Sequence, residues 1–156
     1  MFSLSIDESV DERLHSELVS RLEEQLARMV EAAWQSEKTE RELEADFRIV
    51  NDDSIHRLNH DYRGKDSPTD VLAFAQREGE GGDLCPEILG DVIVSLDTAE
   101  RQAKQDVHSE ILFLFAHGLC HLLGYDHQDD EEESAMNGRM KQLLEESERS
   151  GPVRPA

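Results

Sequence analysis

The chain has 156 residues and a formal net charge of −20, with 37% hydrophobic and 33% charged residues. This length is sufficient for one domain with a compact core of its own. The large excess of acidic residues argues against a protein that coats nucleic acid by bulk electrostatic attraction, although the potential inside a cleft depends on the charges that line it.

Hydrophobic periodicity in the first half of the chain predicts two strands and two helices. Residues 2–6 alternate apolar and polar side chains, which is typical of a short strand. From Leu14 to Ala33 apolar side chains recur every three or four residues, and this spacing predicts a long helix that covers the core. A second strand is expected at 47–50, followed by a short helix that Asp52 or Asp53 caps.

The second half is expected to hold two more strands and three more helices. Residues 111–123 are apolar apart from two histidines, so this helix, opened by Ser109 and Glu110, should be buried at the centre of the fold. In order, the expected elements are a strand at 71–75, an exposed Gly-rich loop at 76–87, a strand at 88–96 interrupted at Gly90 and Asp91, a polar helix to about 105, the apolar helix, a final acidic helix and a disordered tail at 150–156.

This order of elements predicts the fold class. Four strands and about five helices in mixed order favour an α+β fold with one small mixed sheet, packed as a single domain over residues 1–149. The central helix would then carry its histidines at the edge of the core.

The sequence also indicates a compartment. Two cysteines, Cys85 and Cys120, are too few for a disulfide framework and fit a reducing environment. The start of the chain, MFSLSIDESVDER, has no basic region or long apolar segment, so a signal peptide is not expected. The longest apolar run, 111–116, is too short to span a bilayer. We therefore expect a cytoplasmic protein with no membrane partner.

Three histidines cluster around the end of the apolar helix. His117 and His121 are four residues apart, which places both imidazoles on one face of a helix. Gly124 can end the helix in a left-handed turn, and the chain beyond it can bring His127 back over the same face. Three neutral imidazoles with a fourth position open are the ligand set of a catalytic zinc. The alternative, three packed core histidines, would require a separate partner for each buried nitrogen.

The residue after the first histidine bears on the reaction. The spacing resembles the zinc-binding helix of metzincin proteases in its ligand positions. Gly118 stands where those proteases carry the glutamate that serves as general base. This difference argues against peptide hydrolysis by the same route.

Three further positions allow two interpretations each. Arg63, with Lys65, is expected in a loop of turn-forming residues, as either a solvated cation or a clamp for a phosphate. Asp91 is either a structural carboxylate or a hydrogen-bonding partner of a ligand histidine. Cys120 is either a buried small hydrophobe or a further metal contact.

Three segments carry a family resemblance. The sequences HGLCHLLGYDH at 117–127, LNHDYRGKDSPTDVLAF at 58–74 and LGDVIVS at 89–95 resemble the YbeY family of bacterial rRNA-maturation endoribonucleases. The resemblance runs from about residue 47 to the final helix. It departs from the usual family pattern at Cys120, where leucine is common, and at Ala73, where serine is common.

The resemblance implies both a site and a function. His117, His121 and His127 would hold one zinc ion (Zn2+) per chain, and Arg63 would be required for ribonuclease activity. The implied activity is cleavage of single-stranded rRNA in 16S rRNA 3′-end maturation and ribosome quality control. The implied partners are the ribosome or its small-subunit precursor and ribosome-associated proteins. Two other hypotheses are a metal-dependent hydrolase of peptides or small molecules, and a non-catalytic ribosome-assembly factor in which zinc only joins the helix end to its loop.

Overall fold

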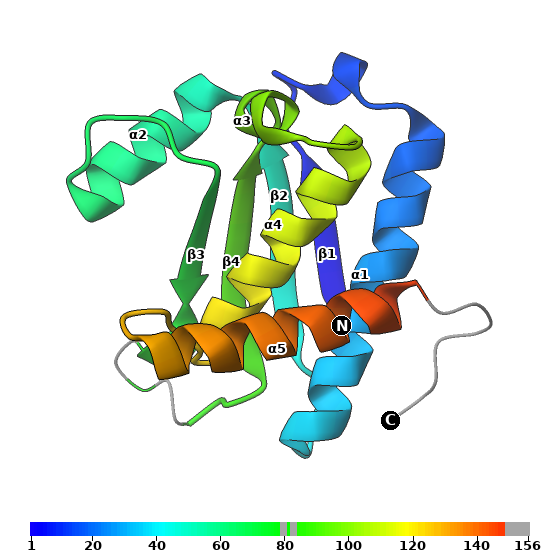
Figure 1. Ribbon diagram of the computed structural model, residues 1–156, viewed down its shortest axis with the longest axis vertical. Helices are drawn as coiled ribbons and strands as arrows, with labels where there is room; N and C mark the ends of the chain where they lie inside the picture. Colours follow the sequence, from blue (N-terminus) through cyan, green and yellow to red (C-terminus); the bar gives the residue numbers. More distant parts are fainter. Residues whose placement is uncertain (79–80, 82–83, 149–156) are drawn as a thin grey trace.

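The structure, a computed structural model, describes residues 1–78, 81 and 84–148 (Figure 1). The expected tail at 150–156 and part of the expected loop at 76–87 lie outside the described residues. The elements are β1 (Phe2–Ile6), α1 (Ser16–Glu37), β2 (Glu44–Val50), α2 (Asp52–Arg63), β3 (Val71–Ala75), β4 (Ile88–Ser95), α3 (Leu96–Gln102), α4 (Val107–Leu122) and α5 (Asp130–Ser147). The expectation of an α+β fold is confirmed.

The strands form one mixed sheet in the order β1-β2-β4-β3. β1, β2 and β4 are parallel, and α1 provides the helical crossover that a parallel β1–β2 pair requires. β3 pairs antiparallel with β4 and, as the last strand in the order, forms one edge of the sheet. Because β4 lies between β2 and β3, the last strand in the chain occupies an interior position. The elements that follow it, α3 and α4, start from the interior of the sheet.

One face of the sheet carries α4. On the same face α1 lies beside α4, and α5 crosses over α4 (Figure 1). Val92 and Val94 of β4 point to this layer, because alternate residues of a strand face the same side. The ring of Phe47 in β2 meets Phe115 of α4 edge-on, with 5.1 Å between the ring centroids. Most residues of α4 are buried, so the expectation of a buried central helix is confirmed.

The opposite face carries α2 over the β3–β4 edge. Ile55 of α2 packs in a second, smaller cluster with Leu72 of β3 and Ile93 of β4, whose side chains alternate with those that contact α4. α2 and α4 therefore lie on opposite faces of the sheet.

The start of α2 differs from the expected cap. Asn51, instead of Asp52 or Asp53, caps the helix, and its side-chain oxygen accepts a hydrogen bond of 2.9 Å from the Ser54 N–H. Asp52 instead accepts hydrogen bonds from side chains of the β4–α3 junction: Ser95 (2.6 Å), Thr98 (2.7 Å) and Arg101 (2.8 Å). The carboxylate thus joins α2 to α3, a long-range role that local capping rules do not detect.

β4 is continuous where an interruption was expected. It pairs with β3 through both Gly90 and Asp91. Gly90 has φ 129°, and a Cβ atom there would lie 2.0 Å from the carbonyl oxygen of Phe74. The glycine therefore permits a close approach of β3 without ending the strand.

Candidate metal centre

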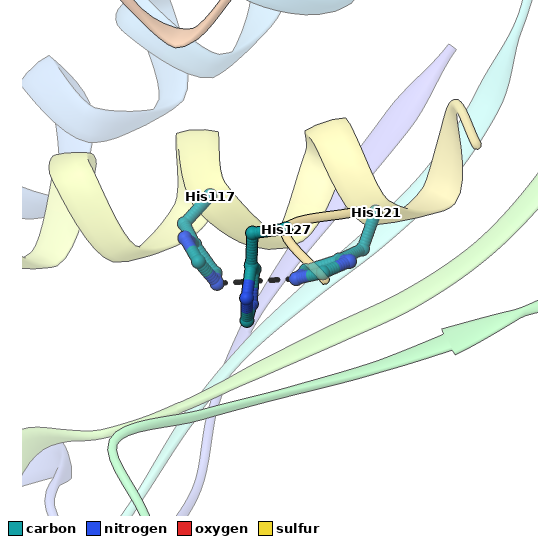
Figure 2. Close-up of side chains that lie close together, drawn as sticks. All are labelled: His117, His121 and His127. Atoms are coloured by element: carbon teal, nitrogen blue, oxygen red, sulfur yellow. Dashed lines mark hydrogen bonds between the residues drawn. The ribbon is translucent and has the colours of Figure 1, made fainter. Parts of the chain in front are cut away.

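α4 ends in a turn that brings the third histidine back. Gly124 has φ 101°, in the left-handed region, and its N–H donates to the carbonyl oxygen of His121 at 3.0 Å. The N–H of Tyr125 donates to the carbonyl oxygen of Cys120, also at 3.0 Å. These bonds satisfy the last carbonyl groups of the helix and reverse the chain, so that His127 lies over the face that carries His117 and His121 (Figure 2).

The three imidazoles converge on one point. Figure 2 shows His117 and His121 projecting from the same side of α4, with His127 between them. The Nε2 atoms of His117 and His121 are 3.2 Å apart, and one ligand nitrogen from each of the three rings lies within 4.8 Å of the others. Within the described part of the chain, this is the one group of three such side chains that could hold a metal ion.

The surroundings keep two of these rings neutral. Burial lowers the pKa of His117, the charges of His121 and His127 add to this, and the negative charge of Asp70 opposes it. Burial also lowers the pKa of His121, and the charge of His127 acts in the same direction. Because a metal binds only the unprotonated imidazole, these shifts favour metal binding near neutral pH.

Metal affinity should therefore depend on pH in a defined direction. With the pKa values of His117 and His121 lowered from 6.5, the neutral rings persist below that pH, and protons compete with the metal only as the pH falls through the lowered values. We expect constant affinity above about pH 6.5 and a decline only once the pH falls through the lowered values, measured by metal titration from about pH 8 down to the pH at which the protein unfolds. Constant affinity over that whole range would show that the histidines do not bind the metal.

Gly118 packs against β4. A Cβ atom at this position would lie 2.3 Å from Cγ1 of Val92, so β4 occupies the space that a side chain would need. A glutamate at 118 would have to displace the sheet. In this chain, packing of α4 on β4 therefore leaves no room for a metzincin-type base at this position.

Replacing Gly118 by alanine should destabilise the protein. The added methyl group would overpack the contact with Val92, at a cost of about 1–3 kcal/mol in the free energy of unfolding. Gly138 of α5 is the matched control, because a Cβ atom there meets nothing within 4 Å. Gly138→Ala should stabilise the helix by about 0.5–1 kcal/mol. Urea unfolding of both variants tests this, and equal effects of the two changes would contradict the packing.

Cys120 does not belong to the metal centre. It is fully buried in the main core, and burial raises the pKa of its thiol to about 12. Its sulfur is not among the ligand atoms that converge with the histidines. Of its two interpretations, the small buried hydrophobe is the one that the geometry supports.

Arg63 lies apart from the histidines. It is the last residue of α2 and not a loop residue, since Gly64 ends the helix with φ 69°. Its side chain is exposed and makes no hydrogen bond or ion pair within the described residues. α2 and α4 lie on opposite faces of the sheet, so Arg63 and the histidines come from elements on opposite sides of it. Lys65, also exposed, follows in the loop.

Asp91 also faces away from the histidines. It lines a wide groove of about 1210 Å3 on the open face of the sheet, together with Asp46 and Arg48 of β2. Burial raises the pKa of the Asp91 carboxyl, and the charge of its cross-strand neighbour Asp46 acts in the same direction. A hydrogen bond to a ligand histidine is therefore not its role.

Two carboxylates near the site were not singled out from the sequence. The charge of Asp70, just before β3, acts on both His117 and Glu110, so Asp70 lies within electrostatic range of each of them. Glu110 precedes His117 by seven residues, or two helical turns. That spacing places it on the same face of the helix and could have identified it from the sequence. Asp70 reaches the site only through the antiparallel pairing of β3 with β4.

None of the described helices combines the length and apolar character needed to cross a membrane.

Comparison with known proteins agrees with the motifs. The family described as Endoribonuclease YbeY matches residues 9–148. Endoribonuclease YbeY of Bacillus subtilis (strain 168) is 44% identical over 126 residues, covering 75% of this chain and 80% of that protein. Endoribonuclease YbeY of Bacillus cereus (strain B4264) is 43% identical over 149 residues, covering 90% and 92%.

A solved structure has the same fold. The solution structure of TM1509 from Thermotoga maritima matches with a TM-score of 0.59 and 26% identity, over 99% of this chain and 100% of that one. Three observations point to the same family: the fold, the three segments that carry the resemblance, and the length of the match. The chain belongs to the endoribonuclease YbeY family.

Proposed function

We propose that the protein is a zinc-dependent endoribonuclease that cleaves single-stranded rRNA, in 16S rRNA 3′-end maturation and ribosome quality control. The observation that carries the proposal is the convergence of His117, His121 and His127 at the end of α4. The relatives named Endoribonuclease YbeY support RNA as the substrate. In this proposal the three histidines are the metal ligands and Arg63 is the catalytic residue.

The donor set fits zinc. Two imidazole nitrogens bound to one tetrahedral zinc at about 2.0–2.1 Å are about 3.3 Å apart. The Nε2 atoms of His117 and His121, 3.2 Å apart, match this separation. Three imidazole nitrogen donors with no fourth protein ligand among the described residues would leave one position for water or substrate, the arrangement of catalytic sites.

In the proposed reaction the histidines and Arg63 would have separate roles. When bound, zinc supplies Lewis acidity toward a phosphoryl oxygen and lowers the pKa of water to roughly 7. His117 and His121, whose pKa values burial lowers, would hold the metal through their unprotonated ring nitrogens. Arg63 would bind the phosphate and stabilise the charge that develops as the bond breaks, because its planar guanidinium donates two parallel hydrogen bonds.

The surface charge indicates how the substrate is found. A formal net charge of −20 repels free RNA, so affinity for RNA alone should be weak and sensitive to salt. We infer that the ribosome, its small-subunit precursor or ribosome-associated proteins supply much of the targeting. This substrate places the proposed activity in the cytoplasm.

The experiment is a cleavage assay on matched substrates. Zinc-loaded protein, freed of contaminating nuclease, is incubated with a single-stranded 16S rRNA 3′ segment, with the same segment in a duplex, and with peptides. Cleavage of the single strand alone is expected. Cleavage of peptides alone would favour the hydrolase with the metzincin-like ligand spacing. No cleavage of any substrate, even with ribosomal particles present, would favour a non-catalytic assembly factor.

A further inference from the structure

A large aromatic side chain is exposed beside the metal centre. Phe113 is 46% exposed, although it lies on α4, the most buried helix of the protein. It precedes His117 by four residues, one helical turn, so the two side chains lie on the same side of the helix. A single exposed apolar residue is ordinary on a protein surface. What distinguishes this one is its place next to the three histidines.

A carboxylate without a hydrogen-bond partner flanks this ring. Glu110 precedes Phe113 by three residues and lies on the same side of α4. Its side chain is half-buried and makes no hydrogen bond within the described residues. Burial raises the pKa of Glu110, the charge of Asp70 acts in the same direction, and Lys104 opposes both. A half-buried acceptor with no partner gains stability when a ligand donates a hydrogen bond to it.

The chemistry of this strip selects one part of an RNA chain. Glu110 and Asp70 give the strip negative charge, which repels phosphate groups. An uncharged base can instead lie flat on the face of Phe113, and its exocyclic amino group can donate to the carboxylate of Glu110. Uracil has a carbonyl oxygen, O4, where cytosine has its amino group, and that oxygen would face the carboxylate unfavourably.

We propose that Phe113 and Glu110 form a nucleobase subsite on α4, one and two turns before the histidines, in which a base that carries an amino group stacks on Phe113 and donates a hydrogen bond to Glu110. This inference rests on the proposed ribonuclease function and adds a base preference to it. The subsite holds the nucleotide next to the scissile phosphate, while Arg63 and the metal act on the phosphate itself.

The stacking half is tested with Phe113→Leu, which keeps an apolar side chain but removes the ring. Loss of one base stack should lower kcat/KM by about 5- to 150-fold. Most of the change should lie in KM, and Phe113→Trp should restore the wild-type value. Leu84→Ala is the matched control, because Leu84 is 80% exposed and lies outside α4, and it should leave kcat/KM unchanged. Equal kcat/KM for wild type and Phe113→Leu would overturn the proposal.

A binding measurement tests the subsite independently of RNA cleavage. Wild-type protein should quench the fluorescence of a 2′-O-methyl oligonucleotide that contains 2-aminopurine, because that base would stack on Phe113. Phe113→Leu should lose the quenching and Phe113→Trp should keep it. Absence of quenching by the wild-type protein would overturn the subsite even if RNA is cleaved. Quenching without any cleavage would instead contradict the proposed enzymatic function and leave the subsite in place.

The proposed hydrogen bond from the base to Glu110 is tested by measuring the base preference of cleavage. Single-turnover rates are measured on oligonucleotides that differ only in cytosine or uracil beside the cleaved bond. Wild type should cleave the cytosine substrate faster than the uracil substrate. Glu110→Gln should bring the ratio of these two rates closer to one, because a neutral amide accepts a weaker hydrogen bond than a carboxylate. Glu133→Gln, an exposed change in α5, should leave the ratio unchanged. An unaltered ratio in Glu110→Gln would remove Glu110 from the subsite.

Discussion

Replacing His121 by alanine is expected to remove nearly all bound zinc and, with it, RNA cleavage. Among the described residues, His121 is one of three nitrogen donors that converge, and its Nε2 lies 3.2 Å from that of His117. Two remaining donors, His117 and the exposed His127, would leave a zinc ion with half of its coordination positions open to water. The measurement is metal content of the purified variant, determined beside wild type after the same dialysis.

His60→Ala controls for the loss of any imidazole. His60 is exposed on α2, beside Asp61, and belongs to no group of converging ligands in the described part of the chain. This variant should keep its zinc. Because zinc binds the folded chain, a chelator should lower the melting temperature of wild type and of His60→Ala but not that of His121→Ala. Full zinc retention by His121→Ala would remove the metal site from the proposal.

Replacing Arg63 by alanine is expected to slow cleavage by about a hundred- to a thousand-fold, the range for one deleted donor to the transition state. Zinc content and folding should stay at wild-type levels, because Arg63 is exposed and has no hydrogen bond or ion pair among the described residues. The measurement is single-turnover cleavage of a single-stranded rRNA 3′ segment, with all proteins matched for zinc. A rate loss with zinc retained would separate phosphate binding from metal binding.

Two further variants sharpen this test. Arg57→Ala removes an equal charge from the exposed surface of the same helix and should leave the rate nearly unchanged. Arg63→Lys keeps the charge but loses the planar pair of donors, so we expect only partial recovery. If Arg57→Ala slowed the reaction as much as Arg63→Ala, a general loss of positive charge would be the cause. Equal rates for wild type and Arg63→Ala would exclude Arg63 from catalysis.

Local sequence patterns determined the elements and the histidine cluster. β1 and β3 begin and end at the residues predicted for them. For β1 the signal was alternation, because residues two apart in a strand share one environment. The spacing of His117 and His121 and the position of Gly124 predicted that the three imidazoles could converge, because both features act within two turns of one helix. Burial of α4 followed from its composition, since a helix that is apolar on all sides must be covered.

The tertiary structure alone decided which side chains face the metal centre. Gly118 and Cys120 are close to the histidines in sequence, and Asp91 belongs to one of the three family segments. In the fold, however, Gly118 packs on β4, Cys120 lies in the core and Asp91 faces the open side of the sheet. Asp70 approaches His117 only because β3 pairs with β4 at the sheet edge. The physical reason is that strand order, β1-β2-β4-β3, does not follow chain order, so contacts between distant elements depend on packing of the whole core. Local periodicity carries no information about that order.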